Sequence, residues 1–270
     1  MKLYRSSPVL RLVRPAIIGA ANSIHRKRVS MKKLLPLFCV LGFAAQPAFA
    51  ANNLNNLQAL AQSEFRALSE DLGSALSYKP LTPAEPLGVS GFDMGIEVTS
   101  TKMSKSEQAW KTATNSTSGL GTIYVPKLHI AKGLPLDIDV AAFYSAIPTT
   151  NVKLTGVELR YAPIPGGVAT PAVAIRGSYT KMSGVDQLSF NTKGLDVSVS
   201  KGFAMFTPYA GVGQVWVSSK ANVGTLAAEN FTQSKVFVGM NINLGMTNIA
   251  LEGDKTGGTS SYGLKLGFRF

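Results

Sequence analysis

The sequence contains one cysteine and two histidines in 270 residues. Cys39 lies in a short apolar stretch that we expect to be cleaved off, so the mature chain would contain no cysteine. That absence excludes disulfides, thiol catalysis and cysteine-ligated metals from the mature protein. No apolar run after residue 50 approaches 18 residues, so we expect no membrane-spanning helix there.

Acidic residues are absent from residues 1–50, whereas the same segment holds nine of the 27 lysines and arginines. The rest of the chain therefore carries 18 basic and 15 acidic residues, and most of the formal charge of +12 belongs to the N-terminal segment. No later basic cluster has interleaved aromatic residues. The composition thus gives no indication of a nucleic-acid partner.

Residues 31–50, MKKLLPLFCVLGFAAQPAFA, have the three parts of a secretory signal peptide. Lys32 and Lys33 supply the positive start, a short apolar run follows, and Ala-Phe-Ala at 48–50 supplies the cleavage motif. A buried hydrophobic helix would account for neither end. Residues 1–30 precede this signal and its own Met31, so we interpret them as an over-extended start. An Arg-rich transit peptide is the alternative for 1–30.

Residues 51–81 predict an amphipathic helix. Apolar residues recur there at spacings of mostly three and four, while Asn, Gln, Glu and Ser occupy the other side. This pattern predicts one helix of about five to seven turns. The prolines of TPAEP (82–86) stop any helix. We therefore predict an amphipathic helix and Pro-rich hinge over 51–86, followed by the body of the protein over 87–270.

From residue 87 onward the hydrophobic period changes to two, which is typical of β-strands. We count about ten strands, which begin near residues 91, 120, 135, 153, 171, 188, 206, 232, 247 and 260. One segment, 209–217, could face either way. For it we favour Tyr209, Val215 and Val217 outward and Gln214 inward.

Two all-β architectures fit this alternation. A soluble β-sandwich buries the apolar row, whereas a transmembrane barrel turns it towards lipid and keeps the polar row inside. The secretory signal, the strand length of about 10 residues and the polar rows favour the membrane barrel. We therefore predict an all-β fold, a closed antiparallel transmembrane β-barrel of about 10 strands (8–12), preceded by the amphipathic helix.

The last ten residues, SYGLKLGFRF, alternate strictly and end on an aromatic residue. This ending resembles that of Gram-negative outer-membrane β-barrel proteins. The resemblance implies location in the outer membrane, contact with outer-membrane lipid, and recognition by the barrel-assembly machinery. The residues that would form the assembly signal are Tyr262, Leu264, Leu266, Phe268 and Phe270.

The polar rows supply charges that we expect in the lumen of this barrel. They comprise seven acids and six bases, namely Asp93, Glu97, Lys127, Asp137, Asp139, Glu158, Arg160, Arg176, Asp196, Lys235, Glu252, Lys265 and Arg269. A barrel of about eight strands is already filled by side chains, so about ten leave little room. Balanced charges in such a lumen should pair and plug it, so we predict no wide diffusion pore.

Candidate catalytic and metal-binding residues are few. His129 is the only histidine after residue 50, and the residues that follow it, Ile130 and Ala131, offer no serine partner. Asp137 and Asp139 could bind a hard cation, but such a pair more often meets Lys or Arg across a lumen. We therefore predict no enzyme, no cofactor and no metal site.

Three functions remain open at this point. The first is a non-enzymatic outer-membrane barrel, structural or surface-presenting, with a narrow charge-plugged lumen. The alternative is a narrow channel or transporter for a small or apolar solute, gated by the N-terminal helix. The third is a lipid-modifying enzyme in which His129 would be the only candidate base.

Overall fold

A computed structural model describes residues 54, 56–115, 119–147 and 151–270. The expected over-extended start at 1–30 and the signal peptide at 31–50 lie outside these residues. None of the helices in the described part of the chain is long and apolar enough to cross a membrane.

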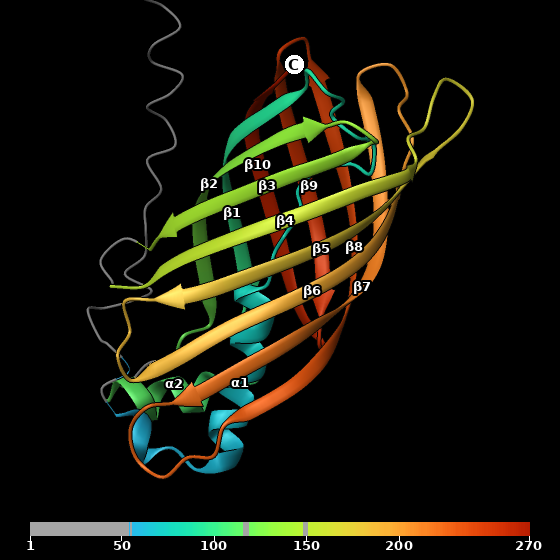
Figure 1. Ribbon diagram of the computed structural model, residues 1–270. Helices are drawn as coiled ribbons and strands as arrows, with labels where there is room; N and C mark the ends of the chain where they lie inside the picture. The colour runs from blue at the N-terminus through green and yellow to red at the C-terminus, as the bar shows by residue number, and fades with distance from the viewer. Residues whose placement is uncertain (1–53, 55, 116–118, 148–150) are drawn as a thin grey trace, which may run out of the picture. The chain divides into compact units, whose positions relative to one another are not determined.

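Ten antiparallel strands form a closed barrel, as the sequence predicts (Figure 1). Each strand pairs with its neighbours in sequence, and the first pairs with the last. The strands are β1 (Phe92–Lys102), β2 (Thr122–Leu134), β3 (Ile138–Ala146), β4 (Lys153–Ile164), β5 (Ala172–Ser183), β6 (Leu188–Ser200), β7 (Phe206–Ala221), β8 (Glu229–Leu244), β9 (Thr247–Thr256) and β10 (Thr259–Arg269).

The seam between β1 and β10 closes the barrel. Ile96 lies opposite Leu266 in a continuous antiparallel register. Beyond the end of β10, the backbone N–H of Phe92 donates to the carbonyl of Phe270 (2.7 Å), and the N–H of Phe270 donates back (3.0 Å). A closed ladder leaves no unpaired edge, which is the condition for placing strands in lipid.

The two faces of the barrel wall are inverted relative to those of a soluble protein. Large apolar side chains point outward and are exposed, such as Ile96 (56 %) and Val238 (64 %). Charged side chains point inward and are buried, such as Arg176 and Lys265 (both 0 %). This arrangement is that of an outer-membrane β-barrel and not of a sandwich, because a sandwich would bury the apolar row.

Strand β7 faces the opposite way from our prediction. Tyr209, Val215 and Val217 point inward and are buried, while Gln214 points outward. The prediction assumed a polar lumen throughout. The lumen at this height instead contains an apolar helix, which supplies partners for the inward valines.

The N-terminal helix is shorter than predicted. A 3₁₀ turn, η3 (Leu57–Ala59), precedes a 15-residue helix, α1 (Gln62–Leu76), and the intervening Leu60 and Ala61 have extended backbone. The helix begins where Glu64 accepts a hydrogen bond from the N–H of Ala61 (3.0 Å). It ends at Leu76, where Ser77 has extended backbone and its hydroxyl donates to the carbonyl of Ser74 (3.0 Å).

A second helix, α2 (Glu107–Thr114), was not predicted and lies in the long connection between β1 and β2. It occupies the same end of the barrel as α1 (Figure 1). We call this end, which carries the long connections, the long-loop end. The opposite end, which carries the chain's C-terminus and the start of β1, is the turn end.

Candidate functional site

The barrel lumen is occupied by the segment that precedes β1. We call residues 54 and 56–91 the plug. From α1 at the long-loop end, the plug continues as an irregular segment through the barrel to β1 at the turn end (Figure 1). Leu81 and Ala84, in this irregular part, are completely buried. The plug therefore passes along the whole lumen.

At the long-loop end the plug forms a hydrophobic core with the barrel wall. The buried residues of this core include Phe65, Leu68 and Leu72 from α1, and also Trp110 from α2 in the β1–β2 connection. The wall contributes inward apolar residues, among them Ile123, Val125, Phe143, Leu154, Phe190, Val215 and Val217. Burial of each large apolar side chain stabilises the fold by about 1.5–3 kcal/mol, so this half of the plug is packed as a protein core.

Two glycines allow close contact between the plug and the wall. A Cβ atom at Gly73 of α1 would lie 2.7 Å from Val217 Cγ2, so only glycine brings this turn of the helix against β7. A Cβ atom at Gly263 of β10 would lie 2.8 Å from Leu81 Cδ2. Glycine weakens a helix, but at Gly73 it allows α1 to pack closely against β7.

Polar contacts fasten α1 to the rim of the barrel. Asp71 Oδ2 accepts hydrogen bonds from the N–H groups of Lys105 and Ser106 (both 2.9 Å) and from the hydroxyl of Ser106 (2.8 Å). Its other oxygen accepts from the Thr259 hydroxyl (2.9 Å). Ser69 and Ser219 of β7 are also hydrogen-bonded, with 2.8 Å between their Oγ atoms. These bonds tie one helix to three separate parts of the barrel.

Glu70 links the plug to the β1–β2 connection through ion pairs. Its carboxylate lies 2.8 Å from Lys105 Nζ and 2.9 Å from Arg66 Nε. Partial burial acts to raise the pKa of Glu70, but the hydrogen bonds from Lys105 and Arg66 outweigh it and lower the pKa below its ordinary value. Glu70 is therefore ionised at neutral pH.

Midway along the lumen, the plug meets charged residues of β8 and β9. Lys79 Nζ lies 2.7 Å from Asp254 Oδ1. The N–H of Leu81 donates to Glu252 (3.1 Å), which also accepts from the Tyr209 hydroxyl (3.0 Å). Lys235 donates to the backbone carbonyl of Tyr78 (2.9 Å). Backbone groups of a non-repetitive buried segment need such partners.

Towards the turn end, the wall charges bind the plug backbone in the same way. Arg160 donates to the carbonyl of Pro83 (2.6 Å) and pairs with Asp139. Asp139 in turn accepts from the N–H of Leu87 (3.1 Å). The Ser200 hydroxyl accepts from the N–H of Ala84 (3.1 Å).

The structure places the predicted lumen charges as follows. Eleven of them point inward and are buried: Asp93, Glu97, Lys127, Asp139, Glu158, Arg160, Arg176, Asp196, Lys235, Glu252 and Lys265. Arg269 also points inward, at the turn end, where it pairs with Asp93. Asp137 does not belong to this set. It is exposed in the turn between β2 and β3, with a left-handed backbone (φ 56°).

Without Asp137 the predicted set contains six acids and six bases. The plug adds an ion pair that we did not predict, between Lys79 and Asp254 of β9, and a completely buried carboxylate, Asp71, that accepts four hydrogen bonds. The charges are therefore nearly balanced, and the wall pairs partly with the plug and not only with itself. The alternation of polar and apolar residues identifies which wall residues face inward. It does not reveal that the plug also lies in the lumen.

His129 lies within the charged lumen near the turn end. Its Nδ1 atom is 3.5 Å from Lys265 Nζ and 3.6 Å from Glu97 Oε1. The other ring nitrogen, Nε2, is buried and has no hydrogen bond to a described residue. Within the described part of the chain, no three His, Asp or Glu side chains gather in a group that could hold a metal ion.

Arg176 is the most weakly satisfied of the lumen charges. Its Nε atom lies 3.0 Å from Glu158. None of its three guanidinium nitrogens, however, has a hydrogen bond of good geometry to a described residue. The nearby wall hydroxyls of Thr180 and Ser198 also have none. The side of the lumen near β5 and β6 thus holds buried polar groups without a hydrogen bond, as does the side near β1 and β2, where Glu97 Oε1 and Lys127 Nζ have none.

No protein-family model and no curated protein matches this chain. Among solved structures, it is similar to the N-terminal β-barrel domain of Pseudomonas aeruginosa OprF, with 16 % identity and a TM-score of 0.33 over 68 % of this chain and 99 % of that one. The KdgM porin in complex with disordered oligogalacturonate has 11 % identity and a TM-score of 0.33, over 67 % and 99 % of the two chains. Acinetobacter baumannii Omp33 has 8 % identity and a TM-score of 0.30, over 69 % and 100 %. Scores this low carry no argument about function.

Proposed function

We propose that this protein is a sealed, non-enzymatic outer-membrane β-barrel that has a structural or surface-presenting role. The observation that carries the proposal is the plug, which fills the lumen with a hydrophobic core at one end and paired charges along the rest. Opening the lumen would expose several large apolar side chains, each at a cost of about 1.5–3 kcal/mol. Such a plug is part of the fold and not a gate.

The long-loop end is then the part available for surface contacts. In outer-membrane barrels the longer connections lie outside the cell and the short turns in the periplasm. Here the long-loop end carries α2, η3 and the start of α1. The plug fastens these elements to the rim through Asp71 and Glu70, which supports a fixed surface and not a mobile one.

A narrow channel or transporter for a small or apolar solute is the second candidate. The buried polar groups without a hydrogen bond, such as the guanidinium of Arg176, favour it, because polar groups of a small solute could satisfy them. A solute that reached them would require the irregular part of the plug to shift.

Planar-bilayer recording of the full-length protein distinguishes the two candidates. A sealed barrel should insert without conductance, whereas steady conductance would contradict the proposal. The Oγ atoms of Ser69 and Ser219 lie 2.8 Å apart, so S69C/S219C places two thiols within reach of a disulfide between plug and wall. Conductance that appears only after reduction would support a movable plug, and S69C alone is the matched control.

A further inference from the structure

The outward-facing charges on the barrel wall are all of one sign. Every charged side chain in the outward rows of the ten strands, all of which the structure describes, is a lysine: Lys102, Lys132, Lys153, Lys181, Lys193, Lys220 and Lys255. The acidic residues of the strands point inward or, in the case of Glu229, pair with Arg66 of the plug. The outer wall therefore carries only positive charge.

Six of these lysines lie towards the long-loop end, and Lys132 alone lies towards the turn end. We call the six the lysine belt: Lys102, Lys153, Lys181, Lys193, Lys220 and Lys255. None of them forms an ion pair with a described residue. A charge that the fold itself does not use is available to a partner outside the protein.

Part of the belt places like charges close together. Lys153 lies opposite Ser183, two residues from Lys181. Lys181 lies opposite Asn191, two residues from Lys193. Such diagonal neighbours on one face are about 7–8 Å apart, and like charges at this range repel. An anion bound between them would remove the repulsion.

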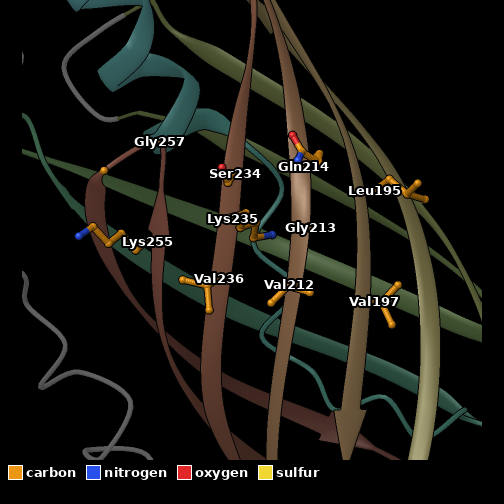
Figure 2. Close-up of a pocket in the computed structure, with 11 residues that line it drawn as sticks. Leu195, Val197, Val212, Gly213, Gln214, Ser234, Lys235, Val236, Lys255 and Gly257 are labelled. Atoms are coloured by element: carbon orange, nitrogen blue, oxygen red, sulfur yellow. The ribbon is translucent and has the colours of Figure 1, made fainter.

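A hollow of about 700 Å³ lies beside this belt. Val197, Val212, Val236 and Lys255 form one row across β6, β7, β8 and β9, since each lies opposite the next in the strand register. Figure 2 shows the three valines side by side on neighbouring strands, with Lys255 on the strand beyond them.

The hollow becomes more polar towards the long-loop end. The next outward row consists of Leu195, Gln214 and Ser234. The row beyond it contains Lys193 and the exposed Trp216. The valines with Lys255 at one end of their row, and the amide, hydroxyl and Lys193 ammonium groups above them, match a lipid whose acyl chains lie along the wall and whose headgroup is anionic.

We propose that the hollow and the lysine belt bind a phosphate-bearing lipid of the leaflet at the long-loop end. The acyl chains would lie on Val197, Val212 and Val236, and Lys255 and Lys193 would contact the phosphate groups. The inference rests on the proposed outer-membrane location. Phosphate is the anion that basic residues at a membrane surface attract, and each lysine near the headgroups contributes about a fivefold gain in affinity.

Native mass spectrometry of the folded, detergent-solubilised protein tests the proposal, with lipid A, whose phosphate groups give it a net negative charge, as the probe. Phosphatidylethanolamine, whose phosphate is balanced by its own ammonium group, is the competitor without net charge. We expect lipid A to be retained preferentially. K193Q/K255Q should weaken that binding by about 25-fold, whereas K132Q, at the other end of the wall, should leave it unchanged within about twofold. Lys193 and Lys255 are exposed, so K193Q/K255Q should keep the heat-modifiable gel migration of the folded barrel. Lys132 is half-buried and donates to the carbonyls of Val89 (2.6 Å) and Gly91 (3.1 Å), so the same gel migration checks that K132Q is folded.

Higher ionic strength should weaken lipid A binding by the unaltered protein but not phosphatidylethanolamine binding, which tests the charge contribution without any substitution. Equal retention of the two lipids by a folded, membrane-inserted barrel would overturn the lipid site and leave the proposed function intact. Displacement of lipid A by inorganic phosphate alone would show that the lysines bind a free anion, and it would overturn the proposal that a lipid occupies the site. Failure of the protein to insert into vesicles would overturn both proposals.

Discussion

The Nζ atom of Lys79 lies 2.7 Å from Oδ1 of Asp254 inside the barrel, and neither side chain is more than 4 % exposed. One residue belongs to the plug and the other to β9, so this ion pair joins the two parts of the molecule where water is excluded. A buried pair adds little net stability over an apolar pair of similar size, but loss of one partner is costly.

Asp254→Asn should therefore destabilise the protein by about 3–5 kcal/mol, because Lys79 would remain buried without its counter-charge. The double variant Lys79→Met/Asp254→Leu should recover most of that loss. Tryptophan fluorescence during denaturant unfolding gives the free energies. A single variant as stable as the double one would show that the two charges are not coupled.

The packing of α1 in the long-loop core predicts a large effect of truncating a helix side chain. Leu68→Ala should lower the free energy of unfolding by about 2–5 kcal/mol, because Leu68 is completely buried. Ser63→Ala, on an exposed position of the same helix, should change it by less than about 0.5 kcal/mol. The temperature at which gel migration shifts reports both. Equal effects would mean that α1 is not packed in the lumen.

The path of the plug predicts on which side of the membrane its helix lies. Because the mature chain is expected to contain no cysteine, single cysteines can be labelled selectively. In intact cells, a membrane-impermeant maleimide should label Ser63→Cys at the long-loop end, but Asp137→Cys, in an exposed turn at the other end, only after the outer membrane is permeabilised. The reverse pattern would place the long-loop end in the periplasm.

The position of Phe270 predicts that it matters more for assembly into the outer membrane than for the stability of the folded barrel. Its side chain is 64 % exposed, yet its backbone forms two hydrogen bonds with Phe92. Deletion of Phe270 should reduce the amount of protein in the outer membrane far more than it destabilises the barrel once folded. Phe270→Ala keeps the backbone bonds and isolates the contribution of the ring. Normal membrane levels of both variants would refute its role as an assembly signal.

The ion pair between Glu70 of the plug and Lys105 of the β1–β2 connection should be lost in acid. The pKa of Glu70 is lowered in the folded protein from an ordinary value of 4.5, so its ion pairs stabilise the fold above pH 4.5. That contribution decreases as the pH falls below this value through the folded-state pKa. Unfolding measured between neutral pH and pH 3 should show a smaller acid effect in Glu70→Gln. An unchanged profile would assign the acid sensitivity to other carboxylates.

The sequence predicts the wall of the barrel well because each wall residue faces either lipid or lumen. In β1, Asp93 and Glu97 alternate with Met94 and Ile96, and the structure gives them opposite faces. The alternation predicts the ten strands, whereas the closed order that the structure shows was predicted from the secretory signal, the strand length and the polar rows, because a sandwich alternates as well. The β7 prediction failed because its inward valines face α1 and not a polar lumen.

The sequence by itself determined the barrel, its lipid-facing row and the amphipathic character of the segment before β1, because each depends on a local period of side chains. Only the tertiary structure decided that this segment lies inside the lumen, that Lys79 meets Asp254, and that six lysines form a belt around the long-loop end. Those relationships join residues up to 188 positions apart, and they depend on how the strands are staggered around the closed barrel and on which chain segment fills it. No local sequence pattern encodes the stagger of the strands or the identity of the segment that fills the barrel.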